Sequence, residues 1–525
     1  MVLPLDAAGR FRWHGDLPMV SHSENPSAAP AGVQRVLVLG GGSAGLLAAL
    51  TLKRLQPNLE VSLVYSSEIG VIGVGEGTTA AFPAHIFDTL GIPKEEFYAG
   101  AQPTWKQGLR LLWGPREDFF YDFEFQYDQR FEGMPKANGF YAAGDCHDLS
   151  QAGALMAREK AFTTGPLGKP VIKGQYAFHI ENHRLVSCLE DVAKRYGVSL
   201  EDDTLDRVET ADGKVTALHF KSGATRTADL YVDASGFRAE LIGKALQEPF
   251  ISYKGSLFCD RAVIGDWQRE DEPILPYTTA ETYDHGWCWQ IEHENFINRG
   301  YVYASEFVSD DEARAEFLAK NPKITGETRV VNFGSGRYER SWVGNVVAIG
   351  NASGFVEPLE ATALAQVVFE CRWLAESLRQ TGSKLDETMI AGFNRVTAIA
   401  WDEIRDFLAY HYKFNTRLDT PFWKHCRENT SLGNYAELHR LYTEVGPNPM
   451  LLVQALPARP NIYGVEGFLA MLVGMQVPHY APHLFSPEEF AGFQRHRDKL
   501  AAQAKAGVSV RQALDAIRRP SWQWT

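Results

Sequence analysis

Three glycines near the start of the chain have the spacing of a loop that binds nucleotide phosphates. They follow the pattern G-x-G-x-x-G, after the apolar run 36–39 and before the helix-like run 46–55. The first glycine of such a turn allows the tight bend, the second lets the backbone approach a pyrophosphate, and the third lets helix and strand pack closely. The helix N-terminus then faces the phosphates. The residues assigned to this turn are Gly40, Gly42, Ser43, Ala44 and Gly45. The pattern predicts a dinucleotide site, with NAD and FAD both open.

The strand expected after this helix, residues 60–65, departs from the usual dinucleotide pattern. The position at its end commonly supplies an Asp or Glu that binds a ribose hydroxyl, and this chain has Tyr65 there. Glu68 is the nearest carboxylate. Either Glu68 substitutes for the missing acid or the ribose contact is absent.

Two other segments carry residues that could take part in binding or catalysis. The first, GVGEGT, contains Gly73, Gly75 and Glu76, and its flexibility suits either close approach to a ligand or an ordinary turn. The second, residues 104–113, alternates as one strand with Lys106 on the face opposite its large apolar residues. A lysine on a strand is usually a solvated surface group, so this pattern alone favours no catalytic role for Lys106.

A later segment, residues 345–366, repeats the order of strand, glycine turn and helix, with Gly350 in the turn. The helix is expected to begin near Glu360. Backbone N–H groups around Thr362 and Ala363 would then form an anion site without a basic side chain. An ordinary capped helix in the core explains the same pattern, and the sequence leaves both interpretations open.

Composition argues against several classes of function. A net charge of -13 without a basic face argues against nucleic-acid binding. The six cysteines include no C-x-x-C pair, which indicates reduced thiols. The histidine pairs at 179/183 and 479/483 lack the H-E-x-x-H pattern, so no catalytic metal is predicted. No apolar run reaches the roughly 18 residues of a membrane span, and no signal-peptide core is visible, so a cytoplasmic protein is expected.

The 525 residues are expected to divide into three parts. Residues 1–32, rich in Ser, Pro and Ala, form an N-terminal tail. Residues 33–400 form the nucleotide-binding core with inserted substrate-side segments, and residues 401–525 form a mainly helical lobe. Within the core, a strand at GWCWQI would place Trp287 and Trp289 on one face.

Five separated motifs together resemble those of the flavin-dependent halogenases of the tryptophan halogenase family. They occur in the family's order and cover most of the chain from residue 33 to about 480. The motifs are GGGSAG (40–45), GVGEGT (73–78), WCWQI (287–291), GFVEPLEAT (354–362) and DTPFW (419–423). The resemblance implies an α/β fold in which an FAD-binding Rossmann-like domain of the p-hydroxybenzoate hydroxylase type carries an added helical lobe that covers the substrate.

The resemblance also implies a division of labour within the enzyme. Reduced FAD and dioxygen would oxidise bromide or chloride to hypohalous acid, which would move inside the protein to a lysine beside the aromatic substrate. A separate NAD(P)H-dependent flavin reductase would supply the FADH2, in agreement with the single G-x-G-x-x-G of this chain. A homodimer is a further expectation.

The family's site residues can be assigned by position. Trp105-Lys106 matches the family's lysine strand, and Lys106 would hold hypohalous acid or become a haloamine. Glu360, the second glutamate of E-P-L-E, would polarise the acid or accept the ring proton. The halide site would be made of backbone amides near Thr362 and Ala363.

Other positions concern the substrate. The resemblance assigns Trp287 and Trp289 to keeping the substrate away from the flavin, although Glu292 replaces the usual proline after this motif. Asp122-Phe123-Glu124 stands in place of the family's His-x-Phe ring sandwich, which makes Phe123 the candidate substrate contact. These differences predict an indole-like or other electron-rich aromatic substrate and not free tryptophan.

The halide pocket also departs from the family pattern. Ala361 and Ala363 stand where the best-known members have Ser and Gly. The lost hydroxyl and the added methyl group predict a preference for bromide, which is larger and more easily oxidised than chloride.

Two other functions share part of this pattern. A flavin monooxygenase that hydroxylates an aromatic ring would have the glycine turn, but it offers no reason for Lys106, Glu360 and the paired tryptophans to occur together. A catalytically inactive flavin-binding relative would not need both Lys106 and Glu360. Dependence of the product on added halide distinguishes the halogenase from the hydroxylase, and FAD binding without turnover of any aromatic would identify the inactive relative.

Overall fold

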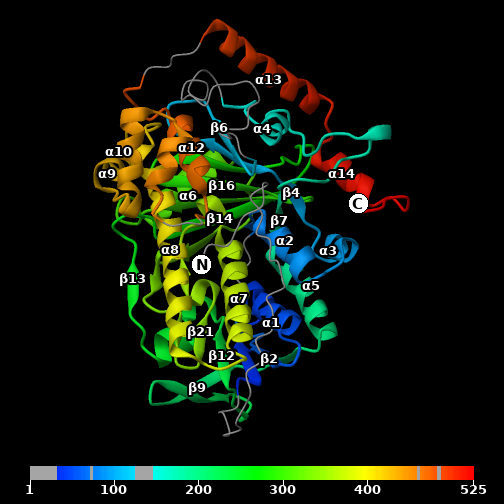
Figure 1. Cartoon of the computed structure of the whole chain (residues 1–525), viewed down its shortest axis with the longest axis vertical. Helices are drawn as coiled ribbons and strands as arrows, with labels where there is room; N and C mark the ends of the chain where they lie inside the picture. The colour runs from blue at the N-terminus through cyan, green and yellow to red at the C-terminus, as the bar shows by residue number, and fades with distance from the viewer. Residues whose placement is uncertain (1–31, 71–74, 125–145, 458–460, 482–485, 525) are drawn as a thin grey trace, which may run out of the picture.

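The computed structural model describes residues 32–70, 75–124, 146–457, 461–481 and 486–524. The predicted N-terminal tail, apart from its last residue, and Gly73 lie outside these ranges. Figure 1 shows a nucleotide-binding half, with α1, α7 and β12, and a second half crowned by the helices α9, α10, α12 and α13.

The nucleotide-binding half is built on a six-stranded sheet, parallel except for the edge strand β20. In spatial order its strands are β20 (Trp342–Val343), β21 (Val346–Ala348), β12 (Leu230–Asp233), β1 (Arg35–Leu39), β2 (Glu60–Tyr65) and β8 (Ser199–Asp202). This order confirms the strands predicted from the apolar runs at the start of the chain.

Alternation along β1 explains how this sheet is covered on both faces. Val36 and Val38 face a core shared with three helices, whereas Leu37 and Leu39 face a different core on the other side. The helices are α1 (Ser43–Leu55), α5 (Asn182–Arg195) and α7 (Ala363–Gln380). The opposite face is covered by a three-stranded antiparallel sheet of β9 (Leu205–Ala211), β10 (Lys214–Phe220) and β11 (Thr225–Arg226).

The second half contains a seven-stranded sheet. In spatial order its strands are β18 (Arg329–Asn332), β14 (Arg261–Gln268), β17 (Phe296–Tyr303), β16 (Gly286–Glu292), β15 (Thr278–Tyr283), β5 (Gly108–Leu112) and β6 (Phe119–Asp122). The strand predicted for GWCWQI is confirmed as β16. Because neighbours along this sheet are antiparallel except β15 and β5, it can be built largely from short connections.

Two small sheets join these parts. One consists of β13 (Phe250–Ser252), β19 (Gly336–Tyr338) and β22 (Gly354–Phe355), and the other of β3 (Gly75–Gly77), β7 (Ala177–Glu181) and β4 (Thr104–Lys106). The single strand predicted over 104–113 is therefore wrong. The chain leaves one sheet after Lys106 and enters the seven-stranded sheet at Gly108. The break falls at Gln107, because its backbone N–H donates to the Pro276 carbonyl and its side-chain amide donates to the Ala161 carbonyl.

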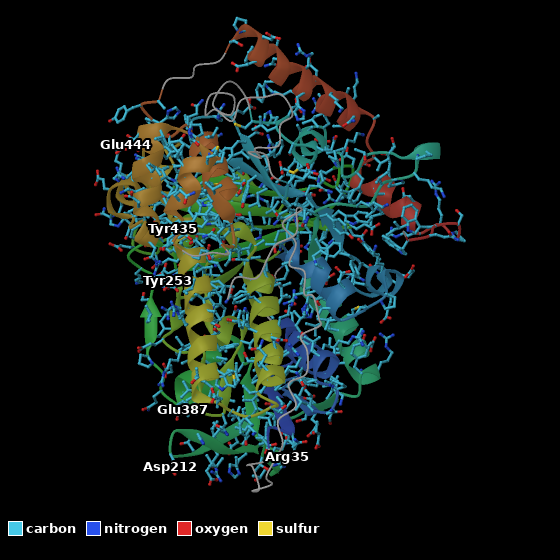
Figure 2. The ribbon with its side chains drawn as sticks, viewed as in Figure 1. Arg35, Asp212, Tyr253, Glu387, Tyr435 and Glu444 are labelled. Carbon is cyan, nitrogen blue, oxygen red and sulfur yellow. The ribbon has the colours of Figure 1, made fainter. Side chains whose placement is uncertain are left out.

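Helix α8 (Glu387–Phe414) connects the two halves. Figure 2 shows Glu387, its first residue, toward the same end of the molecule as Asp212 between β9 and β10, whereas Tyr435 lies with the helices toward the other end. The boundary predicted at residue 400 falls inside this helix, so the chain is continuous helix at that point. The helical lobe beyond it is made of α9 (Pro421–Asn429), α10 (Ala436–Val445), α11 (Pro449–Leu452), α12 (Gly464–Gly474), α13 (Pro487–Lys505) and α14 (Val510–Ile517).

Large aromatic side chains fix this lobe to the seven-stranded sheet. Tyr410, Tyr412 and Trp423 are fully buried in one core with Trp113 and Trp287 of the sheet. Burying aromatic residues of this size contributes much of the apolar area that holds two such layers together. Helix α6 (Asp310–Lys320) packs against β14 and β17 of the seven-stranded sheet. The remaining short helices are α2 (Ala81–Ala84), α3 (Lys94–Gly100) and α4 (Gln151–Met156). Among the described residues, none of the helices combines the length and apolar character needed to cross a bilayer.

Candidate active site

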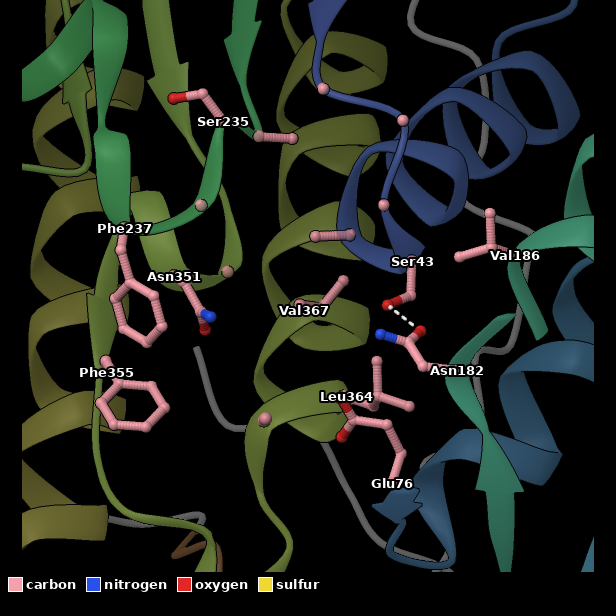
Figure 3. A pocket seen from close by; sticks show the side chains of 18 of the residues that line it. Ser43, Glu76, Asn182, Val186, Ser235, Phe237, Asn351, Phe355, Leu364 and Val367 are labelled. Atoms are coloured by element: carbon pink, nitrogen blue, oxygen red, sulfur yellow. Dashed lines mark hydrogen bonds between the residues drawn. The ribbon is translucent and has the colours of Figure 1, made fainter. Parts of the chain in front are cut away.

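A cavity of about 660 Å³ opens where the carboxyl ends of β1 and β12 meet the starts of α1 and α7. Figure 3 shows its two walls, with the α1 turn and α5 on one side and the segment after β12 on the other. Labelled side chains on these walls are Ser43, Asn182 and Val186 on one side and Ser235, Phe237, Asn351 and Phe355 on the other. The Ser43 hydroxyl donates a hydrogen bond of 3.4 Å to the Asn182 side-chain oxygen.

The three glycines of the first turn have different surroundings. Gly40 has a positive φ of 121°, and a side chain there would collide with the Ala234 carbonyl. A side chain on Gly45 would collide with the carbonyl oxygen of Gly40. A Cβ at Gly42, in contrast, would meet nothing within 4 Å, because this residue faces the cavity. The turn thus has two glycines required by packing and one that leaves room for a ligand.

The end of β2 shows where the two residues considered for the ribose contact lie. Tyr65 lines the cavity and packs against Gly41. The Glu68 carboxylate instead accepts hydrogen bonds from Lys221, at 2.7 Å, and from Thr204 on the surface. Asp203 is the carboxylate that lines the cavity near Tyr65, although it also binds Ser222. Glu68 therefore does not substitute for the missing acid in this conformation.

Residues 75–77 of the GVGEGT segment lie in the lining of the same cavity. Gly75, Glu76 and Gly77 make up β3 and line it, and Figure 3 shows the Glu76 side chain beside Leu364. Burial raises the pKa of Glu76 to about 7, because a carboxylate loses hydration there. Gly350 lines the cavity with a positive φ of 63°.

Lys106 is fully buried, contrary to the usual position of a lysine on a strand. Its Nζ atom has no hydrogen-bond partner among the described residues. Burial lowers the pKa of Lys106 to about 8, and the negative charge of Glu360 acts in the opposite direction. The ammonium group lies 5.7 Å from the centre of the Phe123 ring, a distance at which a cation and a ring face attract each other. Lys106 is therefore a buried amine that is available for a small reactant.

Gly77 separates this lysine from the cavity. A Cβ at Gly77 would lie 3.2 Å from the Ala361 Cβ, and 3.5 Å from both Lys106 Nζ and Thr278 Oγ1. Thr278 and Ala361 themselves line the cavity. Gly77 thus lies between the cavity and Lys106, at a point where any side chain would contact Ala361, Thr278 and the lysine amine.

Glu360 lies in a 3₁₀ turn, Pro358–Glu360, and not in the helix itself. The prediction that the helix begins near Glu360 is three residues early, because Ala361 takes a left-handed φ of 54° and α7 begins at Ala363. Thr362 is the N-cap of α7, and Ala361 and Ala363 line the cavity. The helix start predicted to bind an anion therefore lies at the cavity wall, with its first backbone N–H groups free of intrahelical partners.

His411, on α8, lies beside Glu360, and no sequence motif indicated it. Its Nε2 atom lies 2.7 Å from Glu360 Oε1, and both side chains are buried. Burial raises the pKa values of Tyr121 and Tyr463, and the nearby negative charge of Glu360 raises them further. The Tyr463 hydroxyl is buried without a partner among the described residues. No local pattern distinguishes His411 from other histidines, and only its place eight residues before DTPFW could have pointed to it.

Trp287 and Trp289 lie on one face of β16 with ring centres 6.0 Å apart. Trp289 lines the cavity and donates a hydrogen bond of 3.0 Å to Asn298. The Trp287 indole donates one of 3.0 Å to Glu357, the first glutamate of E-P-L-E, which also accepts from Tyr412. Glu357 therefore links the β16 motif to the turn that carries Glu360.

Within the described ranges, no group of three or more His, Cys, Asp or Glu side chains could hold a metal ion. Cys188, Cys259, Cys288, Cys371 and Cys426 are buried free thiols.

Comparison with known proteins gives the same family throughout. Residues 35–487 match the family model for tryptophan halogenase. The tryptophan 7-halogenase RebH of Lentzea aerocolonigenes is 31% identical over 433 residues, which cover 75% of this chain and 79% of RebH. The tryptophan 6-halogenase ThaL of Streptomyces albogriseolus is 31% identical over 423 residues, 75% of this chain and 79% of ThaL.

Solved structures agree with these sequence matches. MibH, a lanthipeptide tryptophan 5-halogenase, superposes with a TM-score of 0.84 at 34% identity and covers 94% of this chain and 95% of its own. BrvH, a flavin-dependent halogenase from Brevundimonas sp. BAL3, superposes with a TM-score of 0.79 at 28% identity, over 92% of this chain and 99% of its own. The fold predicted from the motifs is confirmed. This chain therefore belongs to the tryptophan halogenase family of flavin-dependent enzymes.

Proposed function

We propose that this protein uses FADH2, dioxygen and bromide or chloride to halogenate an electron-rich, indole-like aromatic ring. Lys106 presents the halogen to that ring. The observation that carries the proposal is the buried amine of Lys106, which has the flavin-sized cavity beyond Gly77 on one side and the Phe123 ring on the other. A buried lysine without a partner is costly to the fold, so a role in chemistry explains its presence better than a structural role does.

The residues of the cavity fit FAD. The open side of Gly42 leaves room for a pyrophosphate at the N-terminus of α1, and Ser43 and Ala44 line the same turn. Gly75, Glu76 and Gly350 line the deeper part. When bound, FAD supplies the oxidising chemistry that converts halide to hypohalous acid. A separate NAD(P)H-dependent reductase supplies FADH2. We propose a cytoplasmic location, because the widely spaced cysteines include no C-x-x-C pair, a pattern typical of reduced thiols.

The protein's own residues then act on hypohalous acid. The acid passes from the cavity to Lys106 beside Gly77, where the missing side chain keeps the backbone from crowding the amine, and the amine holds the acid by hydrogen bond or takes the halogen from it. Glu360 stabilises the positively charged ring after halogen addition and takes its proton. Thr362 and Ala363, at the start of α7, provide the backbone amides for halide. Trp287 and Trp289 keep the aromatic substrate on the Lys106 side.

The substrate is proposed to be an indole-like ring other than free tryptophan. Phe123 lies beside Lys106, where the family's His-x-Phe sandwich is replaced. The similarity to MibH, a lanthipeptide tryptophan 5-halogenase, supports a larger molecule that carries the indole ring. Indole and short tryptophan-containing peptides are therefore the first substrates to test.

The experiment is a mass-spectrometric assay of the purified protein with FAD, a flavin reductase, NADH, halide and a panel of indoles, phenols, tryptophan and tryptophan-containing peptides. A halide-dependent mass shift supports the proposal. An oxygenated product that forms equally without halide would instead identify an aromatic hydroxylase. Flavin binding without any turnover would identify an inactive relative.

Gly42→Val should weaken FAD binding by at least about tenfold, or about 1.4 kcal/mol. The valine would fill the space left for the pyrophosphate, and it would meet no protein atom within 4 Å of its Cβ. Its melting temperature without flavin should therefore equal that of the wild type. Gly45→Val is the contrasting variant, because its side chain would collide with Gly40 and lower the melting temperature. Flavin titration and thermal melts separate the two effects, and equal losses of stability would contradict the assignment.

Gly77→Val should uncouple flavin oxidation from halogenation. The added side chain would fill the space between Ala361, Thr278 and Lys106, so hypohalous acid would be delayed on its way to the amine. We expect the ratio of halogenated product to NADH consumed to fall by about tenfold or more, with flavin affinity changed much less. Trapping of free hypohalous acid by a scavenger dye measures the leak. An unchanged product ratio would show that this route is not used.

Bromide should be preferred to chloride at equal concentration. The Ala361 and Ala363 methyl groups line the cavity where the family commonly has Ser and Gly. Competition of the two halides, read by the masses of the products, gives the ratio directly. Ala363→Gly should shift that ratio toward chloride, and equal or better chlorination by the wild type would contradict the prediction.

A further inference from the structure

The hydrogen bonds of His411, the histidine on α8, fix the position of one of its protons. His411 Nδ1 lies 3.1 Å from the Phe407 carbonyl oxygen, which can only accept a hydrogen bond, so Nδ1 carries a proton. Nε2 lies 2.7 Å from Glu360 Oε1. One proton must occupy this second contact, either on the imidazole or on the carboxyl group. In both forms the Glu360–His411 pair has no net charge.

Packing leaves the imidazole little freedom to turn. The ring meets Trp113 edge to face with centres 6.1 Å apart, and Phe407 in the same manner at 5.2 Å. The exposed fraction of the side chain is 0% for His411 and 3% for Glu360. The contact therefore has to be maintained in the folded protein, because neither polar group can turn to water instead.

The remaining groups around Glu360 come from three other elements. Lys106 lies on β4, Tyr121 on β6 and Tyr463 immediately before α12, and each experiences the Glu360 charge. Among the described residues, the second oxygen, Oε2, makes no hydrogen bond. Oε1 is thus held by His411, and Oε2 remains free for the reacting molecule.

We propose that His411 is a positioning residue that keeps Glu360 oriented and ionised as the base for the ring proton. The inference rests on the proposed halogenation, and it assigns a role to a residue that none of the family motifs contains. After the halogen has bonded to the ring, the ring C–H bond breaks and its electron pair restores aromaticity. The proton moves to Oε2 of Glu360, while His411 retains the proton that balances the carboxylate.

Without this histidine, the carboxylate would be buried with no hydrogen-bond partner and would hold a proton more tightly. A protonated Glu360 cannot take the ring proton. Loss of His411 therefore affects one particular step, the removal of that proton, and raising the pH should restore the step in part because the carboxyl group then ionises.

The test compares His411→Phe and His411→Gln in the halogenation of indole and of ring-perdeuterated indole. In His411→Phe we expect kcat to fall by up to about 100-fold, since a small misplacement of a reacting group has an effect of this size. Removal of the ring proton should then limit the rate, so a primary isotope effect of about 2 or more should appear. In the wild type the isotope effect should be close to 1. Part of the lost activity should return as the pH is raised from about 7 to 9.

The glutamine variant separates orientation from protonation. Its amide can donate to Glu360 Oε1, so His411→Gln should keep more activity than the phenylalanine variant while lacking the titrating ring. Combining His411→Phe with Glu360→Gln should add no further loss, because both act on one proton transfer. His439→Phe, a half-buried histidine of α10 that packs on Phe414, is the matched control.

The outcomes are distinct. The proposal is overturned if His411→Phe stays active and shows no isotope effect. It is also overturned if the variant loses activity without an isotope effect and this loss adds fully to that of Glu360→Gln. Absence of halogenation by the wild-type protein indicates that the proposed function has failed, whereas the role of His411 fails only when the wild type is active.

Discussion

Lys106→Met should abolish halogenation and at the same time make the protein more stable. The loss should be on the order of 10³-fold or more, because the variant lacks the only group proposed to carry the halogen. Flavin binding should persist, since Lys106 does not line the flavin cavity. Mass spectrometry of the indole product and a flavin titration measure the two properties. Halogenation at the native rate and regioselectivity would remove Lys106 from the mechanism.

The gain in stability follows from burial. The pKa of Lys106 is lowered from 10.5 to about 8, so folding at pH 7 carries an electrostatic cost on the order of 3 kcal/mol. Methionine has a similar length and no charge, and it should recover a large part of this cost.

The stability of the wild type relative to Lys106→Met should depend on pH. Below about pH 8 both the folded and the unfolded protein keep the proton, so the full cost remains. Between about 8 and 10.5 the folded protein releases it first, and the wild type should gain stability relative to Lys106→Met. Denaturant unfolding of both proteins across this range tests the point, with exposed Lys254→Met as the control. A variant that is less stable than the wild type at pH 7 would contradict the argument.

Glu360→Gln should lower kcat by roughly 10²- to 10³-fold, within the usual contribution of a general base. Glutamine keeps the size of the side chain and its contact with His411, so the fold and flavin affinity should change little. The remaining activity should no longer depend on ionisation of this residue. Exposed Glu339→Gln is the matched control.

Combining Glu360→Gln with Lys106→Met gives a stricter test. If the two residues act in one sequence of steps, the double variant should be about as inactive as Lys106→Met alone. Losses that simply multiply would indicate that each residue contributes independently. Product yield per NADH consumed is the measurement for all three variants.

Much of the nucleotide-binding half could be predicted because its signals are local. The apolar strand before Gly40 and the spacing of the glycines both lie within a few residues, and β1, β2 and α1 confirm the predicted elements. The break in the strand after Lys106 could not be predicted in the same way. It depends on Gln107 bonding to Pro276 and Ala161, which are distant in sequence.

The candidate site shows the same limit. Residue type and position alone indicated a surface location for Lys106, and only the family resemblance indicated otherwise; the structure buries it completely. His411 was missed because its partner is 51 residues away and lies on another element. A contact that requires a fully folded core leaves no periodic pattern in the chain.

Helix α8 fixes the distance between two sets of hydrogen bonds described above. Trp401 donates to Glu370, which accepts the Gly350 N–H at the flavin cavity, and ten residues later His411 holds Glu360. A rise of 1.5 Å per residue places Trp401 and His411 about 15 Å apart along the helix axis. An insertion of one residue between them would also rotate His411 by about 100° away from Glu360. Protein engineers could therefore exchange the segments beyond Phe414 to admit new substrates, provided that the number of residues between Trp401 and His411 is unchanged.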